Sequence, residues 1–283
     1  MPKGRLRIAT CQFAESFDPL GNAEIVCRYL SAAAKRRADI VHFHEACLSG
    51  YLARKSAPAL ADVNWPAVRQ ATELVCQQAR ALGLWVAVGS SHPLTGPHKP
   101  TNCLYLIGPD GKVHDRYDKR FCMNTDLKVY TPGNRFVTFT INGVVCSLLI
   151  CFDLRFPELY RQLKRMGVQV ILQSFHNGYM DGPGIHEHIM RQTVQAHAGI
   201  NGFWISANNS TGRYSRWPSV FVPPDGAIAA SLKRHVAGIM VNTVGTAQEF
   251  YDPSAAFRPA AMRGILHSGR CVRDKRMDDT TSL

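Results

Sequence analysis

The residues from 144 to 158, VVCSLLICFDLRFPE, constrain the fold more than any other stretch of this sequence. They begin with an apolar run, Val144 to Ile150, which is too short to span a membrane and is typical of a strand buried on both faces. Pro157 and Glu158 are residue types that favour the first turn of a helix. The sequence therefore predicts a buried strand followed by a helix, with Cys151 at the corner between them.

A thiol at such a corner has two interpretations. In an open α/β sheet, ligands bind at the carboxyl ends of the strands, and a helix that begins there directs its partly positive end toward the thiol, which favours the thiolate. Free cysteine is also among the most buried residue types, and position alone favours a core residue. The interpretation of Cys151 depends on which other polar side chains follow strands.

Strands and helices alternate along the chain. Strands are predicted at residues 5–13, 39–44, 84–89, 102–108, 112–117, 168–173, 203–207, 219–222 and 236–244, with a hairpin at 136–150 around Asn142-Gly143. Helices are predicted at residues 22–37, 65–82, 158–166 and 187–197. This order predicts an α/β fold, an α-β-β-α four-layer sandwich in which two mixed sheets meet through apolar faces and helices cover them.

The chain is long enough for one large α/β domain, and no linker is visible. We expect the domain to span residues 1–250, and residues 251–283 to be a tail that is disordered or packed on a neighbouring subunit. No signal-like segment and no run near the ~18 apolar residues of a membrane helix is present. Nine cysteines without a CxxC pair are typical of a reducing compartment, so we expect a soluble, cytoplasmic protein with no membrane partner.

The net charge of +12 can mark a nucleic-acid binder. The basic residues are dispersed, apart from Lys35-Arg36-Arg37 at a predicted helix end, where cations complement the helix dipole. We therefore expect no nucleic-acid partner, and an anionic substrate or simple solubility would account for the charge. The pairs His42/His44 and His186/His188 could suggest zinc, but the helical HExxH spacing is absent and no metal is expected.

Glu45 and Lys119 also stand directly after predicted strands. Each alone is best interpreted as a charged loop residue. Together with Cys151 they supply the groups that hydrolyse an amide without histidine: a thiol nucleophile, a carboxylate as its base, and an ammonium that stabilises the oxyanion with the amide N–H of Phe152.

Other functions have weaker support. Neither a GxSxG elbow nor a glycine-rich phosphate loop is present, which disfavours serine hydrolases and nucleotide enzymes. A Cys-His thiol protease would need a histidine partner, and His176 at a later strand end is the obvious candidate. A subunit that binds a metabolite or a partner without turnover is the non-enzymatic alternative.

Three phrases, ADIVHFHEACLSGY, DRYDKRF and LLICFDLRFPEL, closely resemble the motifs of the nitrilase superfamily, the carbon–nitrogen hydrolases, in the same order. The resemblance extends from Ile8 to about Val244. It implies the α-β-β-α sandwich, a cofactor-free cysteine mechanism, and homodimers or higher homo-oligomers. In the superfamily's triad the matching residues are Glu45 as base, Lys119 as oxyanion stabiliser and Cys151 as nucleophile.

The resemblance has departures as well. Many members carry a second glutamate after the lysine, and here the matching position is Asp126, one methylene shorter; His44 replaces the proline that usually precedes the base. The motif CFDLRFPEL looks most like the omega-amidase-like branch, which implies hydrolysis of a small carboxamide to acid and ammonia through a thioester. N-carbamoyl hydrolase and nitrilase activities are the alternatives. Four residues that follow strand ends are candidate substrate contacts: Tyr51, Phe175, His176 and Asn177.

Overall fold

The computed structural model describes residues 4–176 and 184–281 of the chain. It divides into two compact units, one ending at Glu249 and one beginning at Phe250. The second unit carries two short helices, α5 (Arg258–Met262) and α6 (Lys275–Asp278). The first unit contains both sheets and all the longer helices.

Each of the two sheets of the first unit has six strands. The first sheet has the order β12-β1-β2-β3-β4-β5, formed by Gly238–Gly245, Arg5–Gln12, Ile40–Phe43, Trp85–His92, Thr101–Ile107 and Val113–Asp118. The second has the order β11-β10-β9-β8-β7-β6, formed by Ala230–Ser231, Val220–Val222, Trp204–Asn209, Val170–Phe175, Val144–Ile150 and Thr138–Ile141. The central strands β1-β2-β3 and β7-β8-β9 are parallel, and the others pair antiparallel, so both sheets are mixed.

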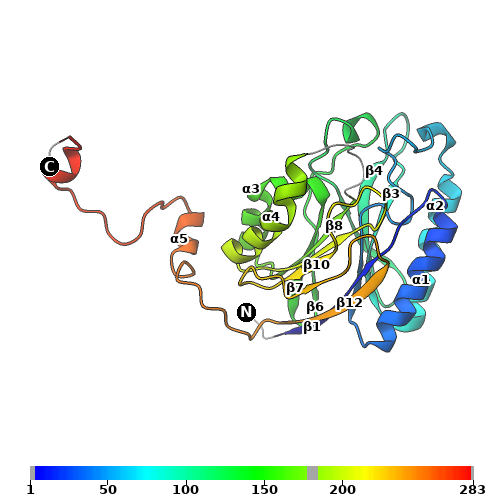
Figure 1. Cartoon of the computed structure of the whole chain (residues 1–283), viewed down its shortest axis with the longest axis horizontal. Coiled ribbons are helices and arrows are strands. Elements are labelled where there is room, and N and C mark those ends of the chain that lie inside the picture. The colour runs from blue at the N-terminus through cyan, green and yellow to red at the C-terminus, as the bar shows by residue number, and fades with distance from the viewer. Residues whose placement is uncertain (1–3, 177–183, 282–283) are drawn as a thin grey trace. The chain divides into compact units, whose positions relative to one another are not determined.

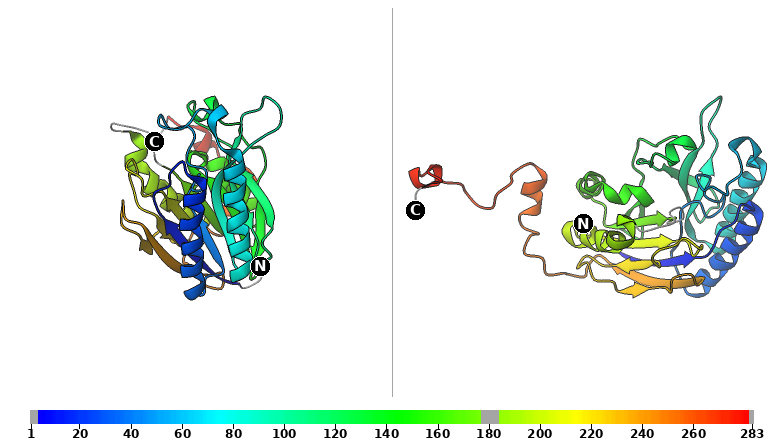
Figure 2. Two further views of the ribbon diagram at one scale, coloured as in Figure 1. Left: turned by 90° about the vertical axis from the view of Figure 1, so that its right-hand side faces the viewer. Right: turned by 45° about the horizontal axis from the view of Figure 1, so that its top comes forward.

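Helices cover the outer faces of the two sheets (Figures 1 and 2). α1 (Pro19–Lys35) and α2 (Trp65–Leu82) lie on the first sheet, and α3 (Pro157–Arg165) and α4 (Ile185–Asn201) lie on the second. The described residues of this unit also form three short 3₁₀ turns: η1 (Leu60–Asp62), η2 (Asp126–Lys128) and η3 (Cys151–Arg155). The predicted α-β-β-α sandwich of two mixed sheets is confirmed.

Local sequence explains where the helices begin and end. The side chain of Asp18 accepts a hydrogen bond from the backbone N–H of Leu20 at 3.1 Å and caps α1, and Asn64 caps α2 in the same way. Gly83, with φ of 64°, ends α2 in the left-handed conformation. The apolar faces of these helices then pack on the outward side chains of the first sheet, among them Phe43.

The two sheets do not meet through apolar side chains alone. His42, on β2, hydrogen-bonds to Ser206 through Nδ1 at 2.8 Å and to Ser174 through Nε2 at 2.9 Å, and both serines belong to the second sheet. Thr10 also bonds to Ser206, at 2.8 Å, and Asn208 donates to the carbonyl of Cys11. Burial lowers the pKa of His42 to about 3, so its imidazole is neutral. The sequence analysis did not predict these polar contacts, because a single strand's pattern does not say which residues of another sheet lie opposite.

Candidate active site

Strand ends bring Glu45 and Lys119 into direct contact. β4 reverses direction after β3 and β5 reverses again, so the ends of β2 and β5 lie at the same edge of the first sheet. Glu45 follows the first of these strands and Lys119 the second. Their side chains are fully buried, and Lys119 Nζ lies 2.9 Å from Glu45 Oε1.

Lys119 has a second buried carboxylate partner, Asp126. The ammonium donates to Asp126 Oδ2 at 2.7 Å, and the hydroxyl of Tyr51 donates to Oδ1. Burial alone would lower the pKa of Lys119, but the carboxylate of Glu45, with a smaller contribution from Asp126, raises it well above its usual value. Lys119 is therefore a fixed cation, and the protein already occupies both oxygens of Asp126.

Asn102 is a site residue that the sequence analysis missed. The side-chain NH₂ of Asn102 donates to Glu45 Oε1 at 2.7 Å, and the backbone carbonyl of Asn102 accepts the backbone N–H of Lys119 at 2.8 Å. The signal was present, because β4 runs antiparallel to β3 and its first residues lie at the edge where β2 ends. Glu45 Oε1 thus has two donors, whereas Glu45 Oε2 has no partner among the residues that the structure describes.

The backbone around Glu45 is tightly packed. A Cβ on Gly89, in β3, would lie 2.2 Å from the carbonyl oxygen of His44 and 2.5 Å from the amide nitrogen of Ala46. Ala46 has a φ of 54°, an uncommon conformation for a residue with a side chain. The glycine therefore permits a close approach that fixes where the Glu45 carboxylate is presented.

Cys151 follows β7 of the second sheet and also has a positive φ, 44°. Asp153, which the sequence analysis did not select as a site residue, fastens this corner. Its carboxylate accepts the N–H of Ile150 at 3.0 Å, the N–H of Phe121 at 2.9 Å and the hydroxyl of Tyr117 at 2.7 Å. Because Tyr117 and Phe121 flank Lys119 in the chain, Asp153 connects the turn at Cys151 to the segment that carries the lysine.

The expectation that this corner favours a thiolate was wrong. The 3₁₀ turn η3 intervenes, and α3 begins only at Pro157, so the thiol is not at the start of that helix. Burial and the carboxylate of Glu45 raise the pKa of the Cys151 thiol well above its usual value, against the lowering effects of Lys119 and of a hydrogen bond from the backbone N–H of His176. The resting thiol is neutral and close enough to Glu45 and Lys119 to respond to both charges.

The candidate substrate contacts have different surroundings. Tyr51 and His176 lie together, with ring centroids 4.8 Å apart. Phe175 is buried with its ring edge-on to Trp217, at 4.7 Å. Phe152 is partly buried beside Phe156, and its amide belongs to the 3₁₀ turn that begins at Cys151. Asn177 lies outside the described residues.

The His176 side chain is not arranged as a base for the thiol. Its Nε2 lies 2.5 Å from Oε1 of Glu15, and its Nδ1 has no hydrogen-bond partner among the described residues. Among the described residues, neither ring nitrogen of His176 therefore forms a hydrogen bond with the sulfur of Cys151. This geometry disfavours the Cys-His thiol protease.

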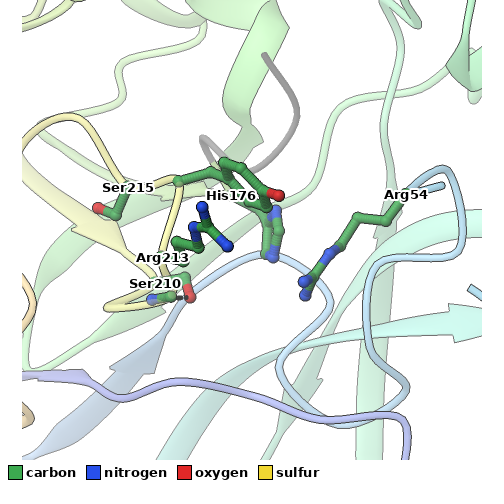
Figure 3. Close-up of a pocket in the computed structure, with 7 residues that line it drawn as sticks. Arg54, His176, Ser210, Arg213 and Ser215 are labelled. Atoms are coloured by element: carbon green, nitrogen blue, oxygen red, sulfur yellow. Dashed lines mark hydrogen bonds between the residues drawn. The ribbon is translucent and has the colours of Figure 1, made fainter. Parts of the chain in front are cut away.

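A small pocket lies beside His176 (Figure 3). It is lined by Arg54, His176, Ser210, Gly212, Arg213, Tyr214 and Ser215. Arg54 donates to Glu15 at 3.3 Å, and the guanidinium of Arg213 lies 5.6 Å from the ring centre of Tyr214. Two cationic side chains thus border the pocket.

Residues 4–176 and 184–281 contain neither a candidate metal cluster nor a helix that could span a membrane. Within them, no three histidine, cysteine or acidic side chains are grouped in a way that could hold a metal ion. None of the helices there combines the length and the apolar character needed to cross a membrane.

Comparisons with known proteins identify relatives of the chain. A protein of Mycobacterium tuberculosis named hydrolase Rv0480c is 32% identical over 187 residues, which cover 63% of each chain. An (R)-stereoselective amidase of Pseudomonas sp. is 27% identical over 76% of this chain and 77% of its own. The human omega-amidase is 25% identical over 79% of this chain and 83% of its own.

The chain is also similar to a solved structure and matches a family model. The structure of a variant of the amidase from Nesterenkonia AN1, of the nitrilase superfamily, has a TM-score of 0.75 and 24% identity over 87% of this chain and 93% of its own, which shows a shared fold. The family model for carbon-nitrogen hydrolases matches residues 7–249. With the match covering almost all of the unit that holds both sheets, the chain belongs to the carbon-nitrogen hydrolase family.

Proposed function

We propose that the protein hydrolyses a small carboxamide to the acid and ammonia through a thioester on Cys151. One observation carries the proposal: Lys119 is held 2.9 Å from Glu45 and 2.7 Å from Asp126, while Glu45 Oε2 lacks a partner in the described part of the chain and the neighbouring thiol is neutral. A neutral thiol needs a base, and a fixed ammonium provides the charge that an oxyanion needs. Membership of the family supports the same chemistry.

The steps follow from these groups. Glu45 accepts the proton of the Cys151 thiol as the sulfur forms a bond to the amide carbon. Lys119 and the amide N–H of Phe152 stabilise the oxyanion, and removal of one such donor commonly costs about 10²–10³ in rate. The intermediate collapses with cleavage of the C–N bond, and Glu45 gives its proton to the departing ammonia. Glu45 then deprotonates a water molecule that attacks the thioester, which releases the acid and returns the thiol.

The acyl group that we propose is small and carries a carboxylate. Arg54 and Arg213 border the pocket beside His176, and the human relative is named for omega-amides. Guanidinium groups suit carboxylates because both are planar and can form paired hydrogen bonds. Tyr51, Phe175, His176 and Asn177 are the side chains that we propose as substrate contacts.

An ammonia-release screen tests the proposal. Purified protein is incubated with omega-amides, neutral aliphatic amides, N-carbamoyl compounds and nitriles. We expect the fastest release from an amide, complete loss in Cys151→Ala, nearly complete loss in Glu45→Gln, and wild-type rates in the control Cys271→Ala, whose cysteine is exposed. Ammonia release that persists in Cys151→Ala would contradict the covalent mechanism. A wild-type protein that releases no ammonia from any compound would favour a binding subunit, and fastest release from a carbamoyl compound or a nitrile would transfer the mechanism to that alternative.

We further propose that the protein acts in the cytoplasm as a homodimer or larger homo-oligomer, with residues 1–250 as the hydrolase domain and no cofactor. Residues 251–283 are proposed to be a tail that is disordered or packs on a neighbouring subunit. Its apolar side chains support this role, because Tyr251 and Leu266 are 94% and 85% exposed in the single chain.

A further inference from the structure

Glu15 is a buried carboxylate that the proposed mechanism does not use. It follows β1, and its side chain is only 1% exposed. Oε1 lies 2.5 Å from His176 Nε2 and 3.3 Å from Arg54 Nη1, and Oε2 accepts the hydroxyl of Ser210 at 2.6 Å. A carboxylate is expensive to bury, so a cluster with this many donors is a built feature of the fold.

The partners of Glu15 connect it to both halves of the candidate active site. His44, whose Nε2 lies 3.9 Å from Glu15, directly precedes the proposed base Glu45. β7 and β8 pair in parallel with Ile150 opposite Ser174, so the backbone of His176, which follows β8, runs beside Cys151, which follows β7. The backbone N–H of His176 lowers the pKa of the thiol, and its ring lies against Tyr51. Glu15 is therefore connected to the proposed base Glu45 through His44 and to the proposed nucleophile Cys151 through His176.

The two histidines beside Glu15 have different charge states. Burial alone would raise the pKa of Glu15, but the charge and hydrogen bond of His176 lower it to about 2. Burial alone would lower the pKa of His176, but the Glu15 carboxylate raises it. Burial lowers the pKa of His44 to about 4, despite the opposing effect of Glu15. Glu15 and His176 thus form a carboxylate–imidazolium pair, and His44 is neutral.

We propose that Glu15 is a positioning residue for the Cys151 nucleophile, and that it acts through an ion pair with His176 rather than through packing. The backbone of His176 runs beside Cys151, and Glu15 fixes the side chain of the same residue. Ser210 and Arg54 fix Glu15 in turn, from the end of β9 and from the loop after Tyr51 (Figure 3 shows Ser210, Arg54 and His176 around the pocket). An isosteric glutamine keeps the packing and removes the ion pair, so the two roles can be separated.

Other groups also act on the His176 imidazole, and any pH effect has to be interpreted with them. The ionisable and charged groups around it are Glu15, His44, Glu45, Tyr51, Arg54, Cys151 and Arg213. Without the carboxylate of Glu15, burial and Arg54 would lower the pKa of His176. The alkaline limb of a pH profile that depends on the imidazolium should then move to lower pH in Glu15→Gln.

The test is a double-mutant cycle with Glu15→Gln and His176→Gln, with Glu24→Gln on the exposed side of α1 as control. It rests on the proposed amide hydrolysis, so the rate of Cys151 alkylation by iodoacetamide, located by mass spectrometry, is measured as a second readout. We expect Glu15→Gln to lower kcat/KM and the alkylation rate about tenfold to hundredfold, the range for losing a hydrogen bond to a charged group. In the His176→Gln background the same change should cost less than about threefold, since the partner is already gone.

Each result decides the proposal. Effects of Glu15→Gln within twofold of wild type, or equal effects with and without His176, would overturn it. If Glu15→Gln fails to fold, Glu15→Asp, which retains the charge, should fold and keep more activity than any neutral replacement; failure of the aspartate variant as well would make Glu15 a stability residue and overturn the proposal. If wild type hydrolyses no amide, the proposed function fails alone, because the alkylation rates still report the positioning of the thiol.

Discussion

Replacing Asp126 by asparagine should make the thiol more reactive toward an alkylating agent and the enzyme slower toward an amide. Asparagine keeps the shape of the side chain but offers one acceptor. Its oxygen should stay on Lys119, 2.7 Å away in the wild type, because an NH₂ group there would face another donor. The NH₂ group then faces the hydroxyl of Tyr51, which can turn and accept. The number of hydrogen bonds is kept, and one negative charge is lost.

The size of the effect follows from that charge. Lys119 keeps a charge-assisted hydrogen bond, because its own ammonium stays ionised, but it loses the attraction of the Asp126 charge. Two unit charges about 4 Å apart attract by about 4 kcal/mol at an effective dielectric constant of about 20, and the cost of burying the carboxylate offsets much of this, so we take the net loss of fixation as about 1–1.5 kcal/mol. If that fixation is used in the transition state, kcat falls about tenfold. The Asp126 carboxylate is also among the groups that raise the pKa of Cys151, so its removal lowers that pKa and increases the thiolate fraction at a fixed pH.

The assay compares ammonia release with iodoacetamide alkylation at pH 8 for the wild type, Asp126→Asn and the control Asp62→Asn, whose side chain is exposed. We expect a several-fold rise in alkylation with a tenfold fall in kcat, and no change in the control. If both rates fell together, the substitution would have damaged the site generally, and an unchanged kcat would show that Lys119 needs no second carboxylate. Either result would refute this reasoning.

Two further predictions concern stability. Gly89→Ala should destabilise the protein by about 1–3 kcal/mol, as overpacking commonly does, because the new methyl group would lie 2.2 Å from the His44 carbonyl oxygen. The resulting displacement of Glu45 should lower ammonia release more than tenfold. The control is Gly245→Ala, where a Cβ has open space, and equal urea denaturation midpoints for the two variants would contradict this prediction. Burial raises the pKa of Asp153 from 3.8 to about 6. Between pH 3.8 and about 6 the carboxyl is therefore protonated in the native state but ionised in the unfolded state, and its contribution to the free energy of unfolding falls by about 2–3 kcal/mol as the pH rises through this range. Asp153→Asn should be less stable overall because three donors lose a carboxylate, yet its unfolding free energy should fall less between pH 4.5 and 7 than that of the wild type; parallel pH profiles would argue against the assignment.

Local patterns predicted the elements well wherever the signal is short-range. Residues 65–82 were expected as a helix and form α2, since apolar spacing and an asparagine cap act within that segment. The Asn142-Gly143 turn joins β6 and β7, with φ values of 50° and 75° that these two residues adopt readily. The two-residue strand β11 was missed, because a strand so short carries no periodic pattern.

Long-range features were harder to infer. Asn102 and Glu15 reach the site from the start of an antiparallel strand and from the loop after β1, and neither lies in a motif. The 3₁₀ turn after Cys151 and the burial of the thiol reverse the expected shift in its pKa, because desolvation depends on residues distant in the sequence. Asp126 was found through the resemblance, but its bonds to Lys119 and Tyr51 required the tertiary structure.

The polar contacts between the two sheets have a consequence for alignment. Glu45 and Lys119 follow strands of one sheet and Cys151 follows a strand of the other, so the distance between the proposed base and the proposed nucleophile depends on how the two sheets are aligned. Two apolar sheet faces could shift relative to each other at little cost, because the hydrophobic effect is non-directional. The hydrogen bonds that His42 makes with Ser174 and Ser206 oppose such a shift, since moving one sheet by even one residue would leave buried donors unsatisfied. The buried, neutral His42 thus fixes the alignment of the two sheets, and with it the relative positions of Glu45, Lys119 and Cys151 at the ends of their strands.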